Sequence, residues 1–397
     1  MTAESLRHIL TMNSGSSSLK FSLYAMGPAE SLVLAGSVER IGLRGGRFSA
    51  WDALGKVLAE EHPEVADHDA AMKILLDWLK RDRPEHGIDA IGHRVVHGGP
   101  RFTEPQRITA DLLRELDDLI RLAPEHLPHE LRVIRASQRH YPAAVQVACF
   151  DTAFHRRMPE VAQRYPLPRS LWHEGVRRYG FHGLSYEYIV GKLREEAGAA
   201  AEGRLIIAHL GNGASMAAVR GGVAVETTMG LTPAGGLMMG TRSGDLDPGV
   251  LLYLLEEKGR SPATVDYLVN QRAGLVGVSE SSSDMRDLLQ RAAEDPHAAQ
   301  AVELFCYQAR KFLGALAAAL GGLETLVFTA GIGAGAPSIR QRICEGLEFL
   351  GIRLDADRNR AGEPVISRDQ SPVTVRVMKT DEELVIARHT CDLLRRE

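Results

Sequence analysis

The chain has 397 residues, a formal net charge of -4, a hydrophobic content of 44% and a charged content of 25%. This length allows two or three domains with large cores, and the composition is that of a globular protein. The small negative charge gives no general attraction to nucleic acid or to an anionic membrane, so any anion site must be local.

The cysteine spacing and the N-terminal segment indicate a cytoplasmic protein. The four cysteines, Cys149, Cys306, Cys344 and Cys391, form no CxxC pair, which favours reduced thiols over a disulfide framework or a zinc site. The first residues, MTAESLRHIL, lack a signal-peptide core. No apolar run approaches the roughly 18 residues that predict a membrane span.

The first predicted unit consists of three strands, over residues 8–12, 19–24 and 32–41. The turn after the first strand, NSGSSS, contains small hydrogen-bonding residues and is followed by Lys20. Backbone amides and hydroxyls in such a turn can hold phosphate oxygens. A plain Ser/Gly hairpin is the alternative interpretation of this segment.

Helical patterns follow at residues 70–80, 111–122 and 131–140, and an apolar strand is predicted at 145–150. The three-strand unit then recurs over residues 205–228, with the turn GNGAS after its first strand. We interpret the recurrence as an internal duplication. It predicts two similar α/β domains facing each other across a cleft, with both polar turns directed at one nucleotide.

The stretch 225–249, VETTMGLTPAGGLMMGTRSGDLDPG, is predicted to be a long loop that lets backbone approach a ligand closely. Arg242 is its one cation, and a guanidinium suits a phosphoryl group in transfer. A flexible surface loop is the alternative. Asp247 and Pro248 form a good helix start. The helix after them is predicted to bury Val250, Leu251, Leu254 and Leu255.

A second Gly-rich turn, AGIGAGA, lies between a predicted strand at 326–329 and a predicted helix at 338–350. That position is typical of nucleotide binding, although the spacing is not GxGxxG. A last strand is predicted at 373–378 and a last helix at 384–394. Asp381, Glu382 and Glu383 precede that helix, where acidic residues complement the helix dipole.

Single polar residues in apolar or aromatic surroundings are further candidates for chemistry. Arg94 interrupts an apolar run, and Asp151 directly follows a buried strand, where sites of α/β proteins lie. His182 is flanked by aromatic and glycine residues, and the segment 283–287 opens a helix with polar groups. Taken singly, each of these residues is more often structural than catalytic.

Together these segments resemble the acetate kinase family. The matching motifs are NSGSSSLK, HRVVHGG, FDTAFH, RRYGFHG, HLGNGAS, MMGTRSGDLDP, SSSDMRD, LVFTAGIG and TDEELVIAR, in the family's order from Asn13 to Arg388. The resemblance implies an α/β fold of two duplicated actin-like (ribonuclease H-like) domains facing across a nucleotide cleft. It implies a cytoplasmic homodimer that transfers the γ-phosphoryl group of ATP reversibly to acetate, giving acetyl phosphate and ADP. The cofactor would be Mg²⁺, for which Mn²⁺ can substitute.

The resemblance also implies domain boundaries and residue roles. The N-terminal domain would span residues 1–150, with a helix at 381–397 returning to it, and the nucleotide-binding domain would span 151–380. Arg94 and Arg242 would clamp the carboxylate and the phosphoryl group, and His182 would hydrogen-bond the phosphoryl group. The remaining implied residues are Val96, Phe181 and Pro233 for the acyl pocket; Asn13 and Glu382 for the metal; and Lys20, His209, Leu210, Gly211, Asn212, Gly213, Asp284, Met285, Arg286, Gly331, Ile332, Gly333, Ala334 and Gly335 for the nucleotide.

Asp151 is a catalytic residue of the family, and chemistry limits its role. A carboxylic acid substrate has a pKa of about 4 to 5, so it is already an anion at pH 7 and has no proton to lose. No general base is needed in the forward direction. We expect Asp151 to orient an arginine or a Mg²⁺-bound water.

Several positions depart from the family's motifs. LAPLHNP reads LAPEHLP, with Glu125 and Leu127, and GFHGTSH reads GFHGLSY, with Leu184 and Tyr186. TPLEG reads TPAGG, and GIGEN reads GIGAG, with Ala334 and Gly335. The changes at Glu125, Leu127 and Leu184 leave open a kinase for propionate or another short acid. The changes at Ala334 and Gly335 leave open a donor other than ATP.

A catalytically silent binding protein on the same scaffold is a further alternative, since actin-like folds also host binding functions. The chain keeps the residues to which the family's chemistry is assigned. They are Asn13, Arg94, Asp151, His182, Arg242 and Glu382. A silent copy has no need to keep them together, so we favour the enzyme.

Overall fold

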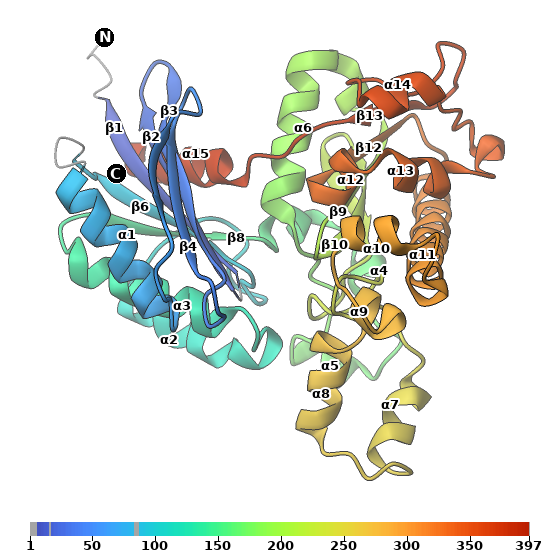
Figure 1. Cartoon of the computed structure of the whole chain (residues 1–397), viewed down its shortest axis with the longest axis horizontal. Coiled ribbons are helices and arrows are strands. Elements are labelled where there is room, and N and C mark those ends of the chain that lie inside the picture. The colour runs from blue at the N-terminus through green and yellow to red at the C-terminus, as the bar shows by residue number, and fades with distance from the viewer. Residues whose placement is uncertain (1–5, 16, 83–86, 397) are drawn as a thin grey trace. The chain divides into compact units, whose positions relative to one another are not determined.

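The computed structural model describes residues 6–15, 17–82 and 87–396 (Figure 1). The chain divides into two compact units: unit 1 is Met1–Ala153 with Asp381–Glu397, and unit 2 is Phe154–Thr380. The last helix therefore belongs to the same unit as the first strands. Over the described residues, no helix is both long and apolar enough to cross a membrane.

Unit 1 contains an eight-stranded sheet in the order β5-β4-β3-β2-β1-β6-β8-β7. Strands β1 to β5 pair antiparallel with one another, β1, β6 and β8 run parallel, and β7 is antiparallel to β8. The bounds are β1 Arg7–Ser14, β2 Ser18–Met26, β3 Glu30–Glu39, β4 Arg47–Asp52, β5 Val57–Glu61, β6 Ala90–Val95, β7 Gln106–Arg107 and β8 Val145–Phe150. The strands predicted at 8–12, 19–24, 32–41 and 145–150 are confirmed.

Helices cover both faces of this sheet (Figure 1). The bounds are α1 His68–Asp82, α2 Ala110–Asp118, η1 Ile120–Leu122, α3 Leu127–His140 and α15 Glu382–Arg395. Leu10 and Met12 face the core formed with α1 and α3, whereas Ile9 faces α15. The helix predicted at 111–122 is interrupted at Leu119, and the helix predicted at 131–140 begins four residues earlier.

Strand alternation decides which polar residues meet α15. Side chains two apart share a face of a strand, so Asn13 lies on the same face as Ile9. In the parallel neighbour β6, Arg94 shares a face with Gly92. A Cβ on Gly92 would lie 2.3 Å from Thr390 Oγ1 of α15, so glycine allows the helix to approach the sheet closely.

Unit 2 contains a five-stranded sheet in the order β11-β10-β9-β12-β13. Its bounds are β9 Arg204–Leu210, β10 Ala214–Arg220, β11 Val223–Thr227, β12 Thr325–Thr329 and β13 Thr374–Val377. β9, β10 and β11 are antiparallel, whereas β9, β12 and β13 are parallel. The order and directions repeat those of β3-β2-β1-β6-β8 in unit 1, which confirms the predicted internal duplication.

The helices of unit 2 form three groups along the chain, before β9, between β11 and β12, and between β12 and β13. The bounds are η2 Ala153–Arg157, α4 Glu160–Gln163, α5 Arg169–His173, α6 Gly183–Ala197, η3 Gly198–Ala201, α7 Pro248–Leu255, α8 Pro262–Gln271, α9 Gly274–Ser279, α10 Met285–Arg291, α11 Pro296–Leu320, α12 Ala330–Gly335, α13 Pro337–Cys344, η4 Glu348–Leu350 and α14 Ala356–Ala361. Helix α6 packs on Leu205 and Ile207 of β9, and Tyr186 and Ile189 contribute to the same core. His209 therefore also faces α6, by strand alternation.

The long loop is confirmed between β11 and α7, and its end forms as predicted, because Asp247 caps α7 by accepting from the Gly249 amide at 2.6 Å. The predicted buried stripe of α7 is wrong. None of its residues is buried, and Val250, Leu252 and Tyr253 are 42%, 54% and 49% exposed. The physical reason is that α7 packs mainly on α8, and no core of the described residues covers it.

Two predictions around the second Gly-rich segment also require correction. Residues 330–335 form the short helix α12 rather than a turn, and the helix predicted at 338–350 ends at Cys344. Gly346 and Gly351 have φ of +78° and +88°, a left-handed conformation that ends helices. The helix predicted at 384–394 is confirmed as α15.

Candidate active-site residues

In unit 1, three predicted site residues lie at the carboxyl ends of adjacent parallel strands. Asn13 is in β1, Arg94 is in β6 and Asp151 directly follows β8. These strand ends meet at one edge of a parallel sheet, where ligands of α/β proteins bind. The edge faces the N-terminus of α15, which carries Glu382.

Arg94 is the centre of this cluster, with a side chain 12% exposed. Its Nη2 lies 2.5 Å from Asp151 Oδ2, and its Nε lies 3.9 Å from Glu382 Oε2. A third carboxylate, Glu130, approaches Nη1 at 3.7 Å. One guanidinium therefore faces three acids, and Asp151 is positioned to orient it.

Glu130 was not among the predicted site residues. It is buried, its Oε2 accepts from the Val96 amide at 3.0 Å, and burial raises its pKa to about 8. Its Oε1 has no hydrogen-bond partner among the described residues. The sequence feature that could have identified Glu130 is its place on the buried stripe of α3, with Leu127, Leu131 and Ile134. Acids are rare on such a stripe unless they are paired or functional.

The residues predicted to hold a metal also lie together. Asn13 Nδ2 donates to Glu382 Oε2 and to Glu383 Oε1, each at 3.2 Å, and burial raises the pKa of Glu382 to about 7. Within the described ranges, no three His, Cys, Asp or Glu side chains form a metal-holding group. One amide and one carboxylate in an acid-rich cluster fit Mg²⁺, which keeps several waters and binds few protein ligands.

In unit 2, His182 is held at the start of α6 with a φ of +58°. Its Nδ1 lies 2.8 Å from Ser215 Oγ, and its ring stacks on His209 at a centroid distance of 4.1 Å. His209 Nδ1 in turn lies 2.8 Å from Ser185 Oγ. Ser185 and Ser215 were not predicted as site residues; strand alternation would have pointed Ser215 toward α6.

Arg242 converges with His182 on a position beside Gly213. Arg242 Nη1 donates to the Pro233 carbonyl at 2.6 Å, which fixes the guanidinium. A Cβ on Gly213 would lie 2.8 Å from Arg242 Nη2 and 3.3 Å from His182 Nε2. The loop is tied to the same turn, because the Gly240 amide donates to the Asn212 carbonyl at 2.9 Å.

The two Gly-rich segments lie side by side, because they follow the parallel strands β9 and β12. A Cβ on Gly211 would lie 3.6 Å from that of Ala330, whereas Cβ atoms on Gly331 and Gly335 would meet nothing within 4 Å. Gly211 is thus packed between the two segments, whereas Gly331 and Gly335 border open space. A ligand can approach the backbone there.

The buried Arg340 holds helix α12 in place. Its Nη1 donates to the carbonyls of Gly333 and Ala334 at 3.0 and 2.8 Å, and its Nε and Nη2 donate to Asn359 Oδ1 and O, both at 2.8 Å. The last carbonyls of a helix have no partner within the helix, and the guanidinium satisfies two of them. Sequence analysis did not identify Arg340 or Asn359.

The remaining predicted residues differ in exposure. The residues predicted for the acyl pocket are buried: Val96, Phe181 and Pro233. The side chains of Met285 and Leu210 are also buried, so a ligand could reach only their backbone. Lys20 is exposed and lies beside Asn13 in the β1–β2 register. Asp284 caps α10 by accepting from the Arg286 amide at 2.8 Å. The Arg286 side chain also donates to Asp284 Oδ2, at 3.1 Å.

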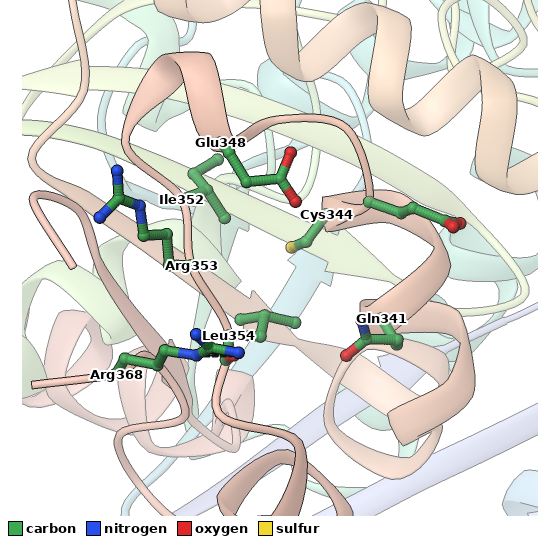
Figure 2. Close-up of a pocket in the computed structure, with 8 residues that line it drawn as sticks. Gln341, Cys344, Glu348, Ile352, Arg353, Leu354 and Arg368 are labelled. Carbon is green, nitrogen blue, oxygen red and sulfur yellow. Dashed lines mark hydrogen bonds between the residues drawn. The ribbon is translucent and has the colours of Figure 1, made fainter. Parts of the chain in front are cut away.

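A separate cavity of about 390 Å³ lies in unit 2 (Figure 2). Arg353 and Arg368 lie on one side of it, opposite Gln341 and Cys344. Burial raises the pKa of Cys344 to about 12, so this residue is a thiol rather than a thiolate at neutral pH. The cavity contains none of the predicted site residues. Its complete lining is Gln341, Cys344, Glu345, Glu348, Ile352, Arg353, Leu354 and Arg368.

Comparison with known proteins gives consistent matches over nearly the whole chain. The model of the acetokinase family matches residues 8–388. An acetate kinase of Rhodopseudomonas palustris is 49% identical over 96% of this chain and 97% of its own length. The crystal structure of Porphyromonas gingivalis acetate kinase is 40% identical, with a TM-score of 0.85 over 98% of this chain and 100% of that chain. A propionate kinase structure from Francisella tularensis is 36% identical, with a TM-score of 0.90 over 97% of this chain and 99% of that chain.

Proposed function

Because the chain belongs to the acetokinase family, we propose that it is an acetate kinase, which transfers the γ-phosphoryl group of ATP reversibly to acetate. In the forward direction, an acetate oxygen forms a bond to the γ-phosphorus. The bond from that phosphorus to the bridging oxygen breaks, ADP leaves with the electron pair, and acetyl phosphate is formed. The acceptor needs no deprotonation, because acetate is an anion at neutral pH.

Unit 1 supplies the groups for the carboxylate. Arg94 can bind it through the planar fork of its guanidinium. Asp151 orients that guanidinium at 2.5 Å, the role expected for it in place of a general base. The buried Val96, whose amide donates to Glu130 at 3.0 Å, contributes apolar surface for the methyl group.

Unit 2 supplies the groups for the nucleotide and the transferring phosphoryl group. The segment 209–213 and helix α12 bind the nucleotide, with Asp284, Met285 and Arg286 as further contacts. Arg242 and His182 stabilise the charge on the phosphoryl oxygens, which is how phosphoryl transfer is usually accelerated. Phe181 and Pro233 are further apolar residues for the acyl group of the substrate.

Mg²⁺, or Mn²⁺ in its place, would be held by Asn13 and Glu382. When bound, the ion would neutralise charge on the phosphates of the nucleotide. Lys20, exposed next to Asn13 in the strand register, adds a cation for the same phosphates. The surplus of acids around Arg94 supports a cation site at this edge of unit 1.

The observation that carries the proposal is the convergence of Arg242 Nη2 and His182 Nε2 on one position beside Gly213. Its test is acyl phosphate formation, trapped as the hydroxamate, from formate, acetate, propionate and butyrate, each with ATP and with pyrophosphate. We expect the highest kcat/KM for acetate with ATP. Product from no acid and neither donor would overturn the proposal and would favour a silent binding protein.

A kinase for propionate or another short acid is the second candidate, with a donor other than ATP as a further variant. The half-buried Glu125 supports it, because this residue stands where the related motif has an apolar leucine. The similarity to a propionate kinase structure agrees with a variable acyl pocket. A higher kcat/KM for propionate than for acetate in the same assay would favour this candidate.

We place the protein in the cytoplasm as a homodimer. The four cysteines are buried and are not joined in disulfides, which agrees with a reducing compartment. Exposed apolar residues gather on α7 and α8, where a second copy of the chain would cover them. These residues are Val250, Leu252, Tyr253 and Tyr267. Light scattering should give twice 43.4 kDa, and Leu252→Glu should shift the particle toward the monomer mass. A monomeric wild-type chain would overturn this assignment.

A further inference from the structure

Ser215 connects two residues of the α6 region through its hydroxyl. The Oγ atom lies 2.8 Å from His182 Nδ1 and also hydrogen-bonds the hydroxyl of Tyr186. His182 and Tyr186 are four residues apart at the start of a helix and so lie on one side of it. Both Ser215 and Tyr186 are fully buried. The three side chains thus form a hydrogen-bonded row, in which the two hydroxyls are shielded from water and His182 is half-buried.

The chemistry of the row favours one direction of its hydrogen bonds. The hydroxyl of Ser215 carries one hydrogen and two lone pairs, so it can accept from one neighbour and donate to the other. A phenol, with a pKa of about 10, is a stronger acid than an aliphatic alcohol and hence the better donor. Tyr186 then donates to Ser215, and the hydrogen of Ser215 points to His182 Nδ1.

We infer that Tyr186 is a positioning residue, which acts through Ser215 to keep Nδ1 of His182 an acceptor and to place the ring proton on Nε2. The tautomer of a histidine is set by the hydrogen bond that its other nitrogen makes. In this case the bond at Nδ1 is made by a buried hydroxyl that is itself polarised by a phenol, and such chains strengthen one another.

The atom that receives the proton faces the position beside Gly213. A Cβ atom on Gly213 would lie 3.3 Å from His182 Nε2 and 2.8 Å from Arg242 Nη2. On the basis of the proposed function, a phosphoryl oxygen bound within hydrogen-bonding reach of both groups accepts from each of them. A neutral His182 ring can donate there only when its proton is on Nε2. Tyr186 thereby keeps the donor directed at the transferring group.

The test is the tautomer of His182 in the ligand-free protein, measured from the ¹⁵N shifts of its ring and assigned by comparison with His182→Asn. We expect the proton on Nε2 in the wild type. Tyr186→Phe keeps the ring that packs in the core of α6 and should shift His182 toward a mixture of tautomers. The control Tyr188→Phe removes a phenol two residues further along α6 and should leave the tautomer unchanged.

Kinetics supply the second measurement. Tyr186→Phe should lower kcat about tenfold while both KM values stay within about twofold, and Tyr188→Phe should match the wild type. A wild-type His182 with its proton on Nδ1 would overturn the inference, as would a Tyr186→Phe variant with unchanged tautomer and kcat. The tautomer is measured without substrates. Failure of the proposed kinase activity is therefore seen separately, as a wild type that forms no acyl phosphate.

Discussion

Arg94 and Asp151 form an ion pair of 2.5 Å at the ends of two adjacent parallel strands. Asp151 is fully buried, and the register of β6 and β8 brings it beside the guanidinium. The pair supports the proposed role of Asp151, which is to orient the guanidinium proposed to bind the carboxylate. A general base would have to face the substrate, which carries no proton to remove.

Replacing Asp151 with asparagine tests this role. We expect Asp151→Asn to raise the KM for acetate and to lower kcat/KM by about tenfold to hundredfold, or about 1.4 to 2.8 kcal/mol. The reason is that the amide keeps the shape but loses the charge-assisted bond. The exposed Asp111→Asn serves as control. A general-base role would instead appear as a collapse of kcat with an unchanged KM.

Gly213→Ala tests whether an added methyl group beside Arg242 lowers the rate. The added methyl group would stand 2.8 Å from Arg242 Nη2, so the guanidinium must move, and we expect kcat to fall at least about tenfold. Gly191→Ala on α6 meets nothing within 4 Å and should raise the stability by up to about 1 kcal/mol without affecting the rate. Equal activity of the two variants would contradict the proposed position of the phosphoryl group.

Arg242→Ala should lower kcat by roughly 10³ to 10⁵, as for other arginines that stabilise phosphoryl transfer. Arg242→Lys should recover little, because lysine lacks the planar fork that donates to both Pro233 and a phosphoryl oxygen. Arg260→Ala, at an exposed position of unit 2, is the control. A lysine variant within tenfold of the wild-type kcat would refute the assignment.

Glu130 predicts a pH dependence of stability. Burial raises its pKa to about 8 in the folded chain, above the ordinary value near 4.3. The folded state thus binds the proton of Glu130 more tightly than the unfolded state does. This difference in proton binding stabilises the fold, and the stabilisation is fully present below the ordinary pKa. It is lost as the pH rises through about 8. Glu130→Gln lacks this contribution, so thermal melting should show a smaller loss of stability between pH 5 and 8 than in the wild type.

The same ionisation should affect substrate binding. Above pH 8, a charged Glu130 lies 3.7 Å from Arg94. It then competes with acetate for the guanidinium, so the wild-type KM for acetate should rise. The KM of Glu130→Gln should stay nearly constant between pH 7 and 9. Parallel pH profiles of the two proteins would show that Glu130 has no part in carboxylate binding.

Glu125→Leu tests the acyl pocket. A carboxylate facing the substrate carboxylate would repel it by roughly 1 to 4 kcal/mol at 4 Å. We expect the acetate KM to stay within a few-fold, because Glu125 is only half-buried and the apolar Leu127 beside it is fully buried. A tenfold gain on acetate, together with lost activity on a hydroxylated acid, would show that acetate is not the intended substrate.

Local sequence was sufficient for many of the elements and for several site residues. An apolar run followed by a polar residue predicts a strand end, so Asn13 and Asp151 could be identified without any tertiary information. The duplicated strand–turn–strand pattern and the Asp247–Pro248 helix start are likewise short-range features. They depend on strand alternation and capping within a few residues, and the structure contains them as predicted.

Only the tertiary structure decided which distant residues meet. Glu130 reaches Arg94 because α3 packs under β6, and Arg340 satisfies α12 carbonyls while holding Asn359 of α14. The same holds for Ser215 between Tyr186 and His182. Such pairs join separate elements whose relative placement is set by the packing of whole faces. The exposure of α7 has the same origin, since its apolar pattern specifies a face to be covered but not which surface covers it.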